Sequence, residues 1–156
     1  MPRKRARRGA GSITHLFNAM AGLHHRDFTI ANFALVEDGF PTELIPDLTH
    51  VGAAAVDLLF RARGLDGIRL VSDGLAAAGT RAKSFEAGGA RLAVKDGIAY
   101  ARGGTIAGSC LPLSASVRAL ARRGLLSLEE AWRLASAEPA ALVRPRAVRG
   151  YCRIPK

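Results

Sequence analysis

The chain has 156 residues and a formal net charge of +10, and a chain of this length suits one domain. Hydrophobic residues make up 49%, which predicts a packed core, whereas the 6% of aromatic residues argues against a stacking platform for single-stranded nucleic acid. Two cysteines, Cys110 and Cys152, are too few for a disulfide or zinc framework, and no apolar run approaches the roughly 18 residues of a membrane span. We therefore expect a reduced, cytoplasmic setting.

The positive charge is concentrated at the two ends of the chain. Residues 1–12 contain five basic side chains, residues 144–156 contain another five, and neither stretch has an acidic residue. The stretch 13–143 contains 13 residues of each sign and is neutral. We predict basic tails at 1–11 and 144–156 around a domain at 12–143. Binding of nucleic acid or another polyanion through these tails is an alternative function, although no recognisable nucleic-acid motif supports it.

The first half of the domain is typical of a parallel α/β unit. Residues 12–17 and 43–48 are predicted strands, and residues 18–22 form the loop after the first of them. Residues 51–63 have apolar side chains at helix period and are followed by Gly64, a good helix terminator. Residues 67–71 form a third strand. A strand, a helix and a strand in this order predict parallel strands joined by a crossover helix.

The second half begins with a β-hairpin and continues with helices. Residues 91–94 and 98–102 are short strands on either side of Asp96-Gly97, a strong type I′ turn signal. Residues 113–123 form a helix that ends at Gly124, and Ser127 with Glu130 forms a capping box for the next helix. Pro139 is expected to break that helix or to restart it. The fold class is therefore α/β with a small β-hairpin insertion.

Polar residues follow the predicted parallel strands. His15 lies in the first strand, His50 closes the second and Asp73 closes the third. The carboxyl ends of parallel strands are where sites are built, and a histidine with a carboxylate suits metal-assisted hydrolysis. Each residue also has an ordinary explanation: a hydrogen-bonded core histidine, a turn aspartate before Gly74, or a solvated basic loop at 24–26. Residue patterns alone leave these alternatives open.

Several motifs in this region, in one order, resemble those of the N-acetylglucosamine-6-phosphate deacetylases, metal-dependent barrel hydrolases of the amidohydrolase superfamily. Residues 14–20 read THLFNAM and residues 23–26 read LHHR, similar to THLFNAM…HHRE of the family. Further similar stretches are DLTHV at 47–51 (family ADGxHV), LVSDG at 70–74 with AAAG at 76–79 (LVTDAMAAAG), GTIAGS at 104–109 (GTLAGS), and LEEA at 128–131 with AEPA at 137–140. The resemblance covers roughly residues 12–142.

The resemblance implies a role for each matching residue. It implies that His15 is a metal ligand, that Asp73 is the catalytic acid and base, and that His50 binds substrate at the reacting centre. It implies further substrate contacts at Asn18, at the backbone of Ala19, at Arg26 for the sugar phosphate, and along a backbone-lined loop at Ile106, Ala107 and Gly108. The implied reaction is hydrolysis of the N-acetyl group of an amino-sugar phosphate, giving glucosamine 6-phosphate and acetate, with a divalent zinc or iron ion as cofactor.

The departures from the family pattern are also informative. The upstream part, which carries a metal-ligating glutamate and a further metal-ligating histidine, has no counterpart here, so we expect a partial (β/α) barrel made of late strands and helices. One histidine cannot hold a catalytic metal that requires about three protein ligands. Leu48 replaces the glycine of the ADG motif, and Phe28-Thr29 replaces a proline–glycine pair. We therefore expect weak or no activity from the chain alone, a homodimer or a separate upstream half as partner, or, alternatively, an inactive gene remnant.

Overall fold

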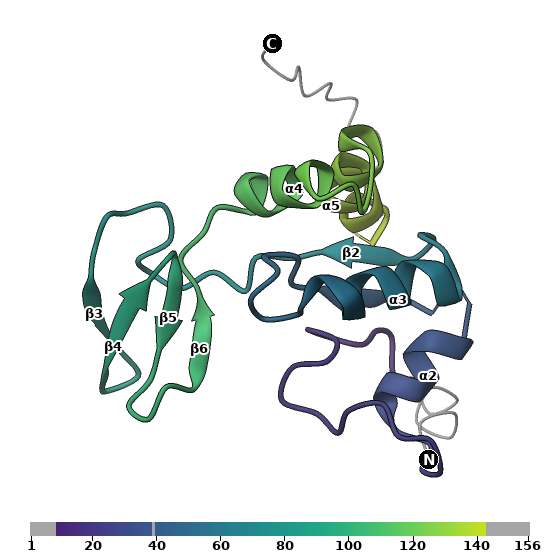
Figure 1. Ribbon diagram of the computed structural model, residues 1–156, viewed down its shortest axis with the longest axis horizontal. Coiled ribbons are helices and arrows are strands. Elements are labelled where there is room, and N and C mark those ends of the chain that lie inside the picture. Colours follow the sequence, from purple (N-terminus) through teal and green to yellow (C-terminus); the bar gives the residue numbers. More distant parts are fainter. Residues whose placement is uncertain (1–8, 39, 143–156) are drawn as a thin grey trace.

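The computed structural model describes residues 9–38 and 40–142, which form a mixed α/β fold (Figure 1). This confirms the expected α/β class. The predicted tail 144–156 and residues 1–8 of the predicted tail 1–11 lie outside the described residues. No helix in the described ranges is long and apolar enough to cross a membrane. The helices are α2 (Ile30–Val36), α3 (Ala53–Arg63), α4 (Leu113–Arg122) and α5 (Leu128–Leu142), and the strands are β1 (Thr42–Leu44), β2 (Ile68–Leu70), β3 (Ser84–Ala87), β4 (Ala90–Lys95), β5 (Ile98–Tyr100) and β6 (Ile106–Ser109).

Strands β1 and β2 pair in parallel through the crossover helix α3, as the sequence predicts. A third segment runs beside β1, where Ile13 forms a single parallel bridge to Thr42. The Glu43 amide donates to the Ile13 carbonyl at 2.8 Å, and the Leu16 amide donates to the Glu43 carbonyl at 2.8 Å. The prediction of a strand over 12–17 is therefore wrong beyond this bridge, because His15 turns into left-handed backbone at φ 34°.

The hydrophobic core lies between the parallel strands and the helices that cover them. Its fully buried side chains come from every layer of this part of the molecule, and burying each one stabilises the fold by about 1.5–3 kcal/mol. They include Leu16, Leu44, Val56, Leu59, Ile68, Leu70, Leu120 and Leu134. The segment that carries His15 is thus anchored by Leu16, although it is not a strand.

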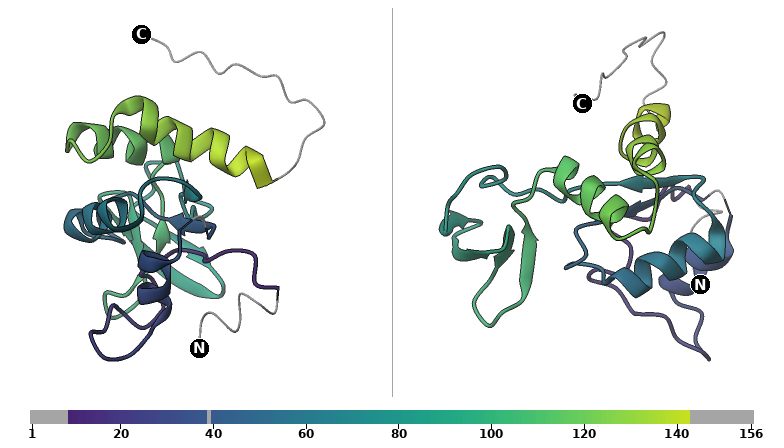
Figure 2. Two further views of the ribbon diagram at one scale, coloured as in Figure 1. Left: turned by 90° about the vertical axis from the view of Figure 1, so that its right-hand side faces the viewer. Right: turned by 45° about the horizontal axis from the view of Figure 1, so that its top comes forward.

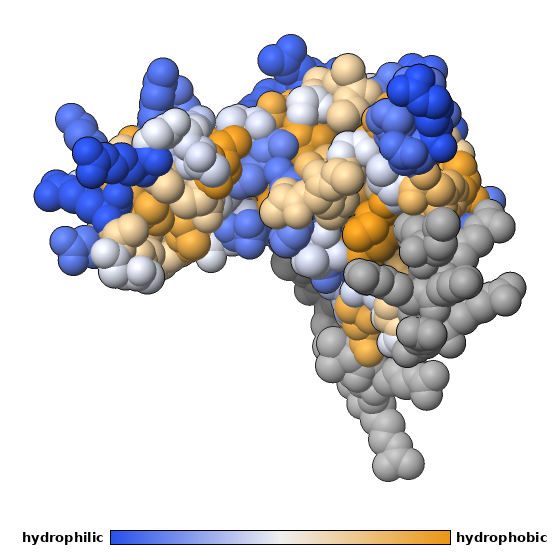
Figure 3. Space-filling model, turned by 90° about the horizontal axis from the view of Figure 1, so that it is seen from below, coloured by the Kyte–Doolittle hydropathy of each residue, from blue (hydrophilic) through white to orange (hydrophobic). Residues whose placement is uncertain are grey.

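The antiparallel sheet forms a separate lobe. Figures 1 and 2 show it joined to the rest of the molecule by the segments after β2 and after β6. Asp96 at φ 52° and Gly97 at φ 77° confirm the predicted type I′ turn between β4 and β5. In the described residues the sheet has four strands in the order β3-β4-β5-β6, so the predicted two-stranded insertion is too small. Figure 3 shows hydrophilic side chains projecting from this lobe.

Two of the sequence predictions for helices need correction. Helix α2 is absent from them, although Thr29 and Asn32 form a reciprocal capping box at its start. Helix α5 begins with the predicted Ser127–Glu130 capping box but continues through Pro139 to Leu142. The prediction of a break is wrong because tertiary contacts support this turn: Arg69 Nε donates to the Glu138 carbonyl at 3.2 Å.

A buried guanidinium at the end of α3 connects β1 to α2 and to the turn before β2. Arg63 is 7% exposed. Its Nη1 donates to the hydroxyl of Thr42 at 2.8 Å and to the carbonyl of Ala34 at 3.4 Å. Its Nη2 donates at 3.0 Å to each of the carbonyls of Phe40 and Asp66. One side chain therefore satisfies acceptors on α2, on the chain before β1, on β1 and on the turn before β2.

We expect Arg63→Met to lower the free energy of unfolding by about 2–4 kcal/mol, because it leaves buried acceptors without donors. Urea unfolding followed by circular dichroism measures this change. Arg61→Met is the matched control on the same helix, since Arg61 is exposed and pairs with Asp57 at the surface at 2.8 Å. A loss of similar size in both variants would contradict the structural role of Arg63.

The capping box of α5 gives a pH-dependent prediction. Hydrogen bonds from the Ser127 amide and hydroxyl lower the pKa of Glu130. Glu130 has this lowered pKa only in the folded state, where the hydrogen bonds exist. Its contribution to stability is therefore present above the ordinary glutamate pKa, and it is lost as the pH falls through the lowered pKa of the folded state. The difference in urea midpoint between the native chain and Glu130→Gln should therefore shrink from pH 7 to pH 3. Glu129→Gln, one residue earlier, should show a smaller pH-dependent difference.

Candidate active site

The candidate catalytic residues lie on loops at one edge of the parallel strands. His15 follows the bridge at Ile13, His50 lies in the loop between β1 and α3, and Asp73 lies directly after the end of β2. Because the three segments are parallel neighbours, their carboxyl ends meet at the same edge. The structure therefore brings these three loops to one side of the α/β part, as the sequence predicts.

Left-handed backbone is concentrated in these loops. In the described residues, the non-glycine positions with positive φ are His15 (34°), Phe17 (74°), Ala19 (50°), Leu48 (64°), Asp73 (47°) and Asp96 (52°). All except Asp96 lie in the three candidate loops. Each such residue costs on the order of 1 kcal/mol, and strain of this kind clusters at functional sites. Leu48 is of particular interest, because it stands where the ADG motif has glycine, the residue type that can adopt a left-handed conformation without strain.

The loop of His15 is closed by its own polar groups. His15 Nδ1 lies 3.2 Å from the Asn18 carbonyl oxygen, and the Asn18 amide donates to the carbonyls of His15 at 3.4 Å and Leu16 at 3.3 Å. An Nδ1–H that donates to a carbonyl leaves Nε2 for a ligand, which is the usual arrangement of a metal-binding histidine. In this geometry Asn18 holds the loop together, a role that the sequence analysis did not foresee.

His50 and Asp47 form a buried pair. His50 Nδ1 lies 2.6 Å from Asp47 Oδ2, and the two side chains are 4% and 1% exposed. The other carboxylate oxygen, Oδ1, accepts hydrogen bonds from the amides of Thr49 at 2.9 Å and His50 at 2.8 Å. His50 Nε2 is buried and has no hydrogen-bond partner within the described part of the chain. A buried polar atom without a partner is unusual and marks a place where a ligand group can bind.

Asp73 is held against the strand that carries the predicted substrate loop. The Ser109 amide donates to the Asp73 carbonyl at 3.1 Å, and the Leu75 amide donates to the Ser109 carbonyl at 2.9 Å. These bonds bring the end of β6, at Gly108 and Ser109, next to the exposed Asp73. The prediction of a loop at Ile106, Ala107 and Gly108 is wrong, because these residues belong to strand β6. The isolated sequence did not show this strand, since only its pairing with β5 defines it.

Arg26 lies on a separate, exposed loop. Its Nη1 is 2.9 Å from His25 Nε2, and the Asp27 amide donates to His24 Nδ1 at 2.9 Å. The loop is fastened to the start of α2, where the side-chain amide of Asn32 donates to the His24 carbonyl at 2.9 Å. The sequence analysis missed this anchor, because asparagine stands where glutamate or glutamine is usual in a capping box.

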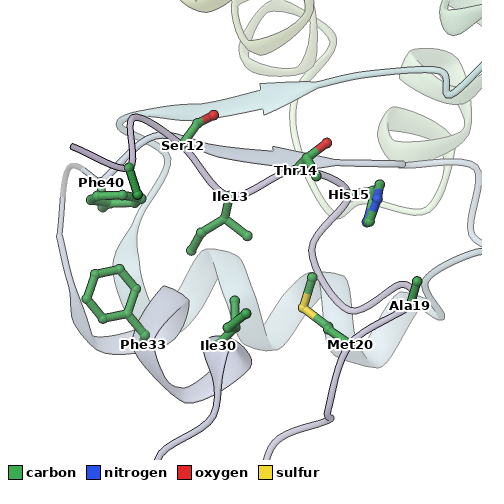
Figure 4. A pocket seen from close by; sticks show the side chains of 10 residues that line it. Ser12, Ile13, Thr14, His15, Ala19, Met20, Ile30, Phe33 and Phe40 are labelled. Atoms are coloured by element: carbon green, nitrogen blue, oxygen red, sulfur yellow. The ribbon is translucent and has the colours of Figure 1, made fainter. Parts of the chain in front are cut away.

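A pocket of about 350 Å³ opens beside His15 (Figure 4). His15, Ala19 and Met20 lie at one end of it, and Phe33 and Phe40 lie at the other. Most of the side chains that line this pocket are apolar, and His50, Asp73 and Arg26 are not among them. The pocket therefore suits apolar side chains better than a sugar phosphate.

The described residues do not by themselves fit a catalytic metal. Across 9–38 and 40–142, no three His, Cys, Asp or Glu side chains are grouped closely enough to hold a metal ion. A catalytic zinc ion needs about three protein ligands, and only His15 is a candidate here. Any such metal would need ligands in addition to those of the described residues.

We expect Gly108→Ala to displace the Asp73 loop. A Cβ at Gly108 would lie 2.9 Å from Leu75 Cγ and 3.2 Å from the Asp73 carbonyl oxygen, at φ +147°. Gly104→Ala is the control, since it also has a positive φ but no atom within 4 Å of the added Cβ. The amide signals of residues 73–75 should shift much more in Gly108→Ala than in Gly104→Ala. Equal spectra in this region would contradict the close packing of β6 against the loop.

Comparisons with known proteins agree with this geometry. No family model matches the chain. It is 39% identical over 113 residues to the N-acetylglucosamine-6-phosphate deacetylase of Bacillus subtilis, covering 72% of this chain and 28% of that protein. The crystal structure of N-acetylglucosamine-6-phosphate deacetylase from Thermotoga maritima superposes with a TM-score of 0.81 at 32% identity, covering 89% of this chain and 38% of that one.

A mutant enzyme of this name from Mycobacterium smegmatis, solved in complex with N-acetyl-D-glucosamine-6-phosphate, gives a TM-score of 0.76 at 31% identity and covers 89% of this chain. In each case the chain spans about a third of the relative's length. Sequence identity and a shared fold over most of the described residues both indicate common ancestry. The chain is therefore homologous to N-acetylglucosamine-6-phosphate deacetylases over most of its own length, and it corresponds to about one third of the length of these relatives.

Proposed function

We propose that these residues form the substrate-binding and acid–base part of a hydrolase that removes the acetyl group from an N-acetylated amino-sugar phosphate. The products would be acetate and an amino-sugar phosphate, glucosamine 6-phosphate if the sugar is that of the relatives. The observation that carries the proposal is the meeting of the His15, His50 and Asp73 loops at one edge of the parallel strands. The substrate class is supported by the relative solved with N-acetyl-D-glucosamine-6-phosphate.

The parallel segments are proposed to be late strands of a (β/α) barrel. The segment at Ile13, strand β1 and strand β2 lie in chain order side by side, and α3 connects the last two. The apolar pocket lies beside the Ile13 segment. Four exposed large apolar side chains, Leu23, Phe28, Ile30 and Val36, lie in the neighbouring stretch around α2. Apolar surface of this extent is consistent with further protein covering this side, from a longer chain, a second copy or a separate upstream half.

Substrate binding is assigned to residues on three loops and one strand. Arg26 offers an exposed guanidinium whose planar donors suit a phosphate group. Asn18 and the backbone of Ala19 would contact the sugar from the His15 loop. The backbone of Ile106, Ala107 and Gly108 would contact it from β6, where the close approach at Gly108 leaves no room for a side chain. These contacts position the acetamido group near Asp73.

The proton transfers are assigned to Asp73. Its carboxylate is exposed at the site edge, where it can take a proton and return it to the leaving amine. His50, with Nε2 free, would contact the acetamido group at the reacting centre. We expect catalysis to be weak or absent in the chain alone. His15 is the single proposed ligand for a zinc or iron ion among the described residues, which do not otherwise provide a metal site.

The proposal predicts ligand binding without efficient turnover. N-acetylglucosamine 6-phosphate, added to the purified chain in isothermal titration calorimetry, should bind about tenfold more weakly to Arg26→Ala, since one phosphate contact is lost. Arg61→Ala, which removes an exposed arginine far from the candidate loops in sequence, should leave the affinity unchanged. Acetate release in the presence of added zinc should stay near background.

Two outcomes would contradict different parts of the proposal. Equal affinity of Arg26→Ala and the native chain would remove Arg26 from the phosphate site. The second outcome is zinc-dependent acetate release that is lost in Asp73→Asn and kept in the control Asp66→Asn, which changes an exposed residue. It would show that the chain is active and that the expected lack of activity is wrong.

A further inference from the structure

The two oxygens of the buried Asp47 carboxylate have different partners. Oδ1 accepts hydrogen bonds from two backbone amides, those of Thr49 at 2.9 Å and His50 at 2.8 Å. Oδ2 lies 2.6 Å from Nδ1 of the His50 ring. A carboxylate oxygen only accepts hydrogen bonds, so the ring nitrogen that faces it must carry a hydrogen. Asp47 thus shapes the loop with one oxygen and selects the hydrogen position on His50 with the other.

The ring of His50 has little freedom to turn away from the Asp47 carboxylate. Both side chains are almost fully buried, at 4% and 1% exposed, so water does not compete for the contact. The loop backbone is also constrained, since Leu48 between the two residues adopts a left-handed conformation at φ 64°. The second ring nitrogen, Nε2, is buried and lacks a partner among the described residues.

We propose that Asp47 is a positioning residue that keeps a hydrogen on His50 Nδ1 and thereby reserves Nε2 for the ligand. This inference rests on the proposed function, because it deepens the role of His50 at the same site. In the neutral ring, Nε2 accepts a hydrogen bond from a hydroxyl or amide N–H of the sugar. In the doubly protonated ring, Nε2 donates to the acetamido oxygen, and the Asp47 carboxylate compensates the positive charge. In both forms the hydrogen on Nδ1 stays in place.

The proposal predicts that Asp47→Asn changes the tautomer of the His50 ring. An asparagine has one carbonyl oxygen, and the two backbone amides of the loop both require it. Its NH₂ group would then face Nδ1, and since NH₂ only donates, Nδ1 must become the acceptor. The ring hydrogen should move to Nε2, so the variant should switch the tautomer of His50 while the loop is retained.

Nitrogen-15 NMR of the full chain labelled at histidine measures this directly. The signals of the four histidines are assigned by the loss of one set in His50→Gln. The native chain, at a pH where the ring is neutral, should show a protonated Nδ1 and an unprotonated Nε2, and Asp47→Asn should show the reverse. Asp57→Asn is the control, because Asp57 lies on α3 and pairs with Arg61 and not with a histidine. It should leave the tautomer of His50 unchanged.

A native His50 with the hydrogen on Nε2 would overturn the inference, and this measurement does not depend on the stability of Asp47→Asn. A folded Asp47→Asn chain that keeps the hydrogen on Nδ1 would overturn it as well. Addition of N-acetylglucosamine 6-phosphate should then shift the Nε2 signal of the native chain and leave Nδ1 protonated. A ligand that removes the hydrogen from Nδ1 would contradict the reserved role of Nε2. If the sugar phosphate binds nowhere, the proposed function fails and the tautomer result is unaffected.

Discussion

The buried guanidinium of Arg63 is the contact on which the arrangement of the parallel strands depends. Burial lowers the pKa of Arg63, while the charge of Asp38 acts in the opposite direction, so the cation is held at a cost in desolvation. Its hydrogen bonds offset that cost by joining α2, β1 and the turn that leads into β2. Because β1 is thereby fixed relative to α2 and to the turn that leads into β2, the loops that follow β1 and β2 keep their relative positions.

The candidate site is built from loops whose backbone is locally unfavourable. Positive φ values at His15, Ala19, Leu48 and Asp73 are maintained only because buried neighbours and hydrogen bonds hold these residues. Leu16 anchors the first loop, the Asp47 carboxylate supports the second, and β6 holds the third through Ser109. The folded core therefore supports a strained edge, which is the usual arrangement when polar groups must be presented to a ligand in a defined geometry.

Regular elements with strong local signals could be predicted from the sequence. The helix that ends at Arg63 has apolar residues at helix period and a terminal glycine, and the Asp96-Gly97 turn has one favoured geometry. Helix α2, with seven residues and an asparagine in its capping box, has a weak signal. Strand β6 has no alternation of its own, since Gly108 and Ser109 are both buried, and it exists through its pairing with β5. Local periodicity does not reveal elements that neighbouring segments create.

For the site, motif resemblance predicted which residues take part, and it did so without any information on their contacts. Residue type alone determined that His15, His50 and Asp73 could ligate, bind or exchange protons, and the order of strand and helix signals determined that they would follow parallel strands. Only the tertiary structure decided that Asp47 would be buried against His50, that Leu48 would take a glycine-like conformation, and that β6 would be held against Asp73. The physical reason is that these features depend on burial and on hydrogen bonds between segments, which hold the chain in conformations that its local sequence does not favour.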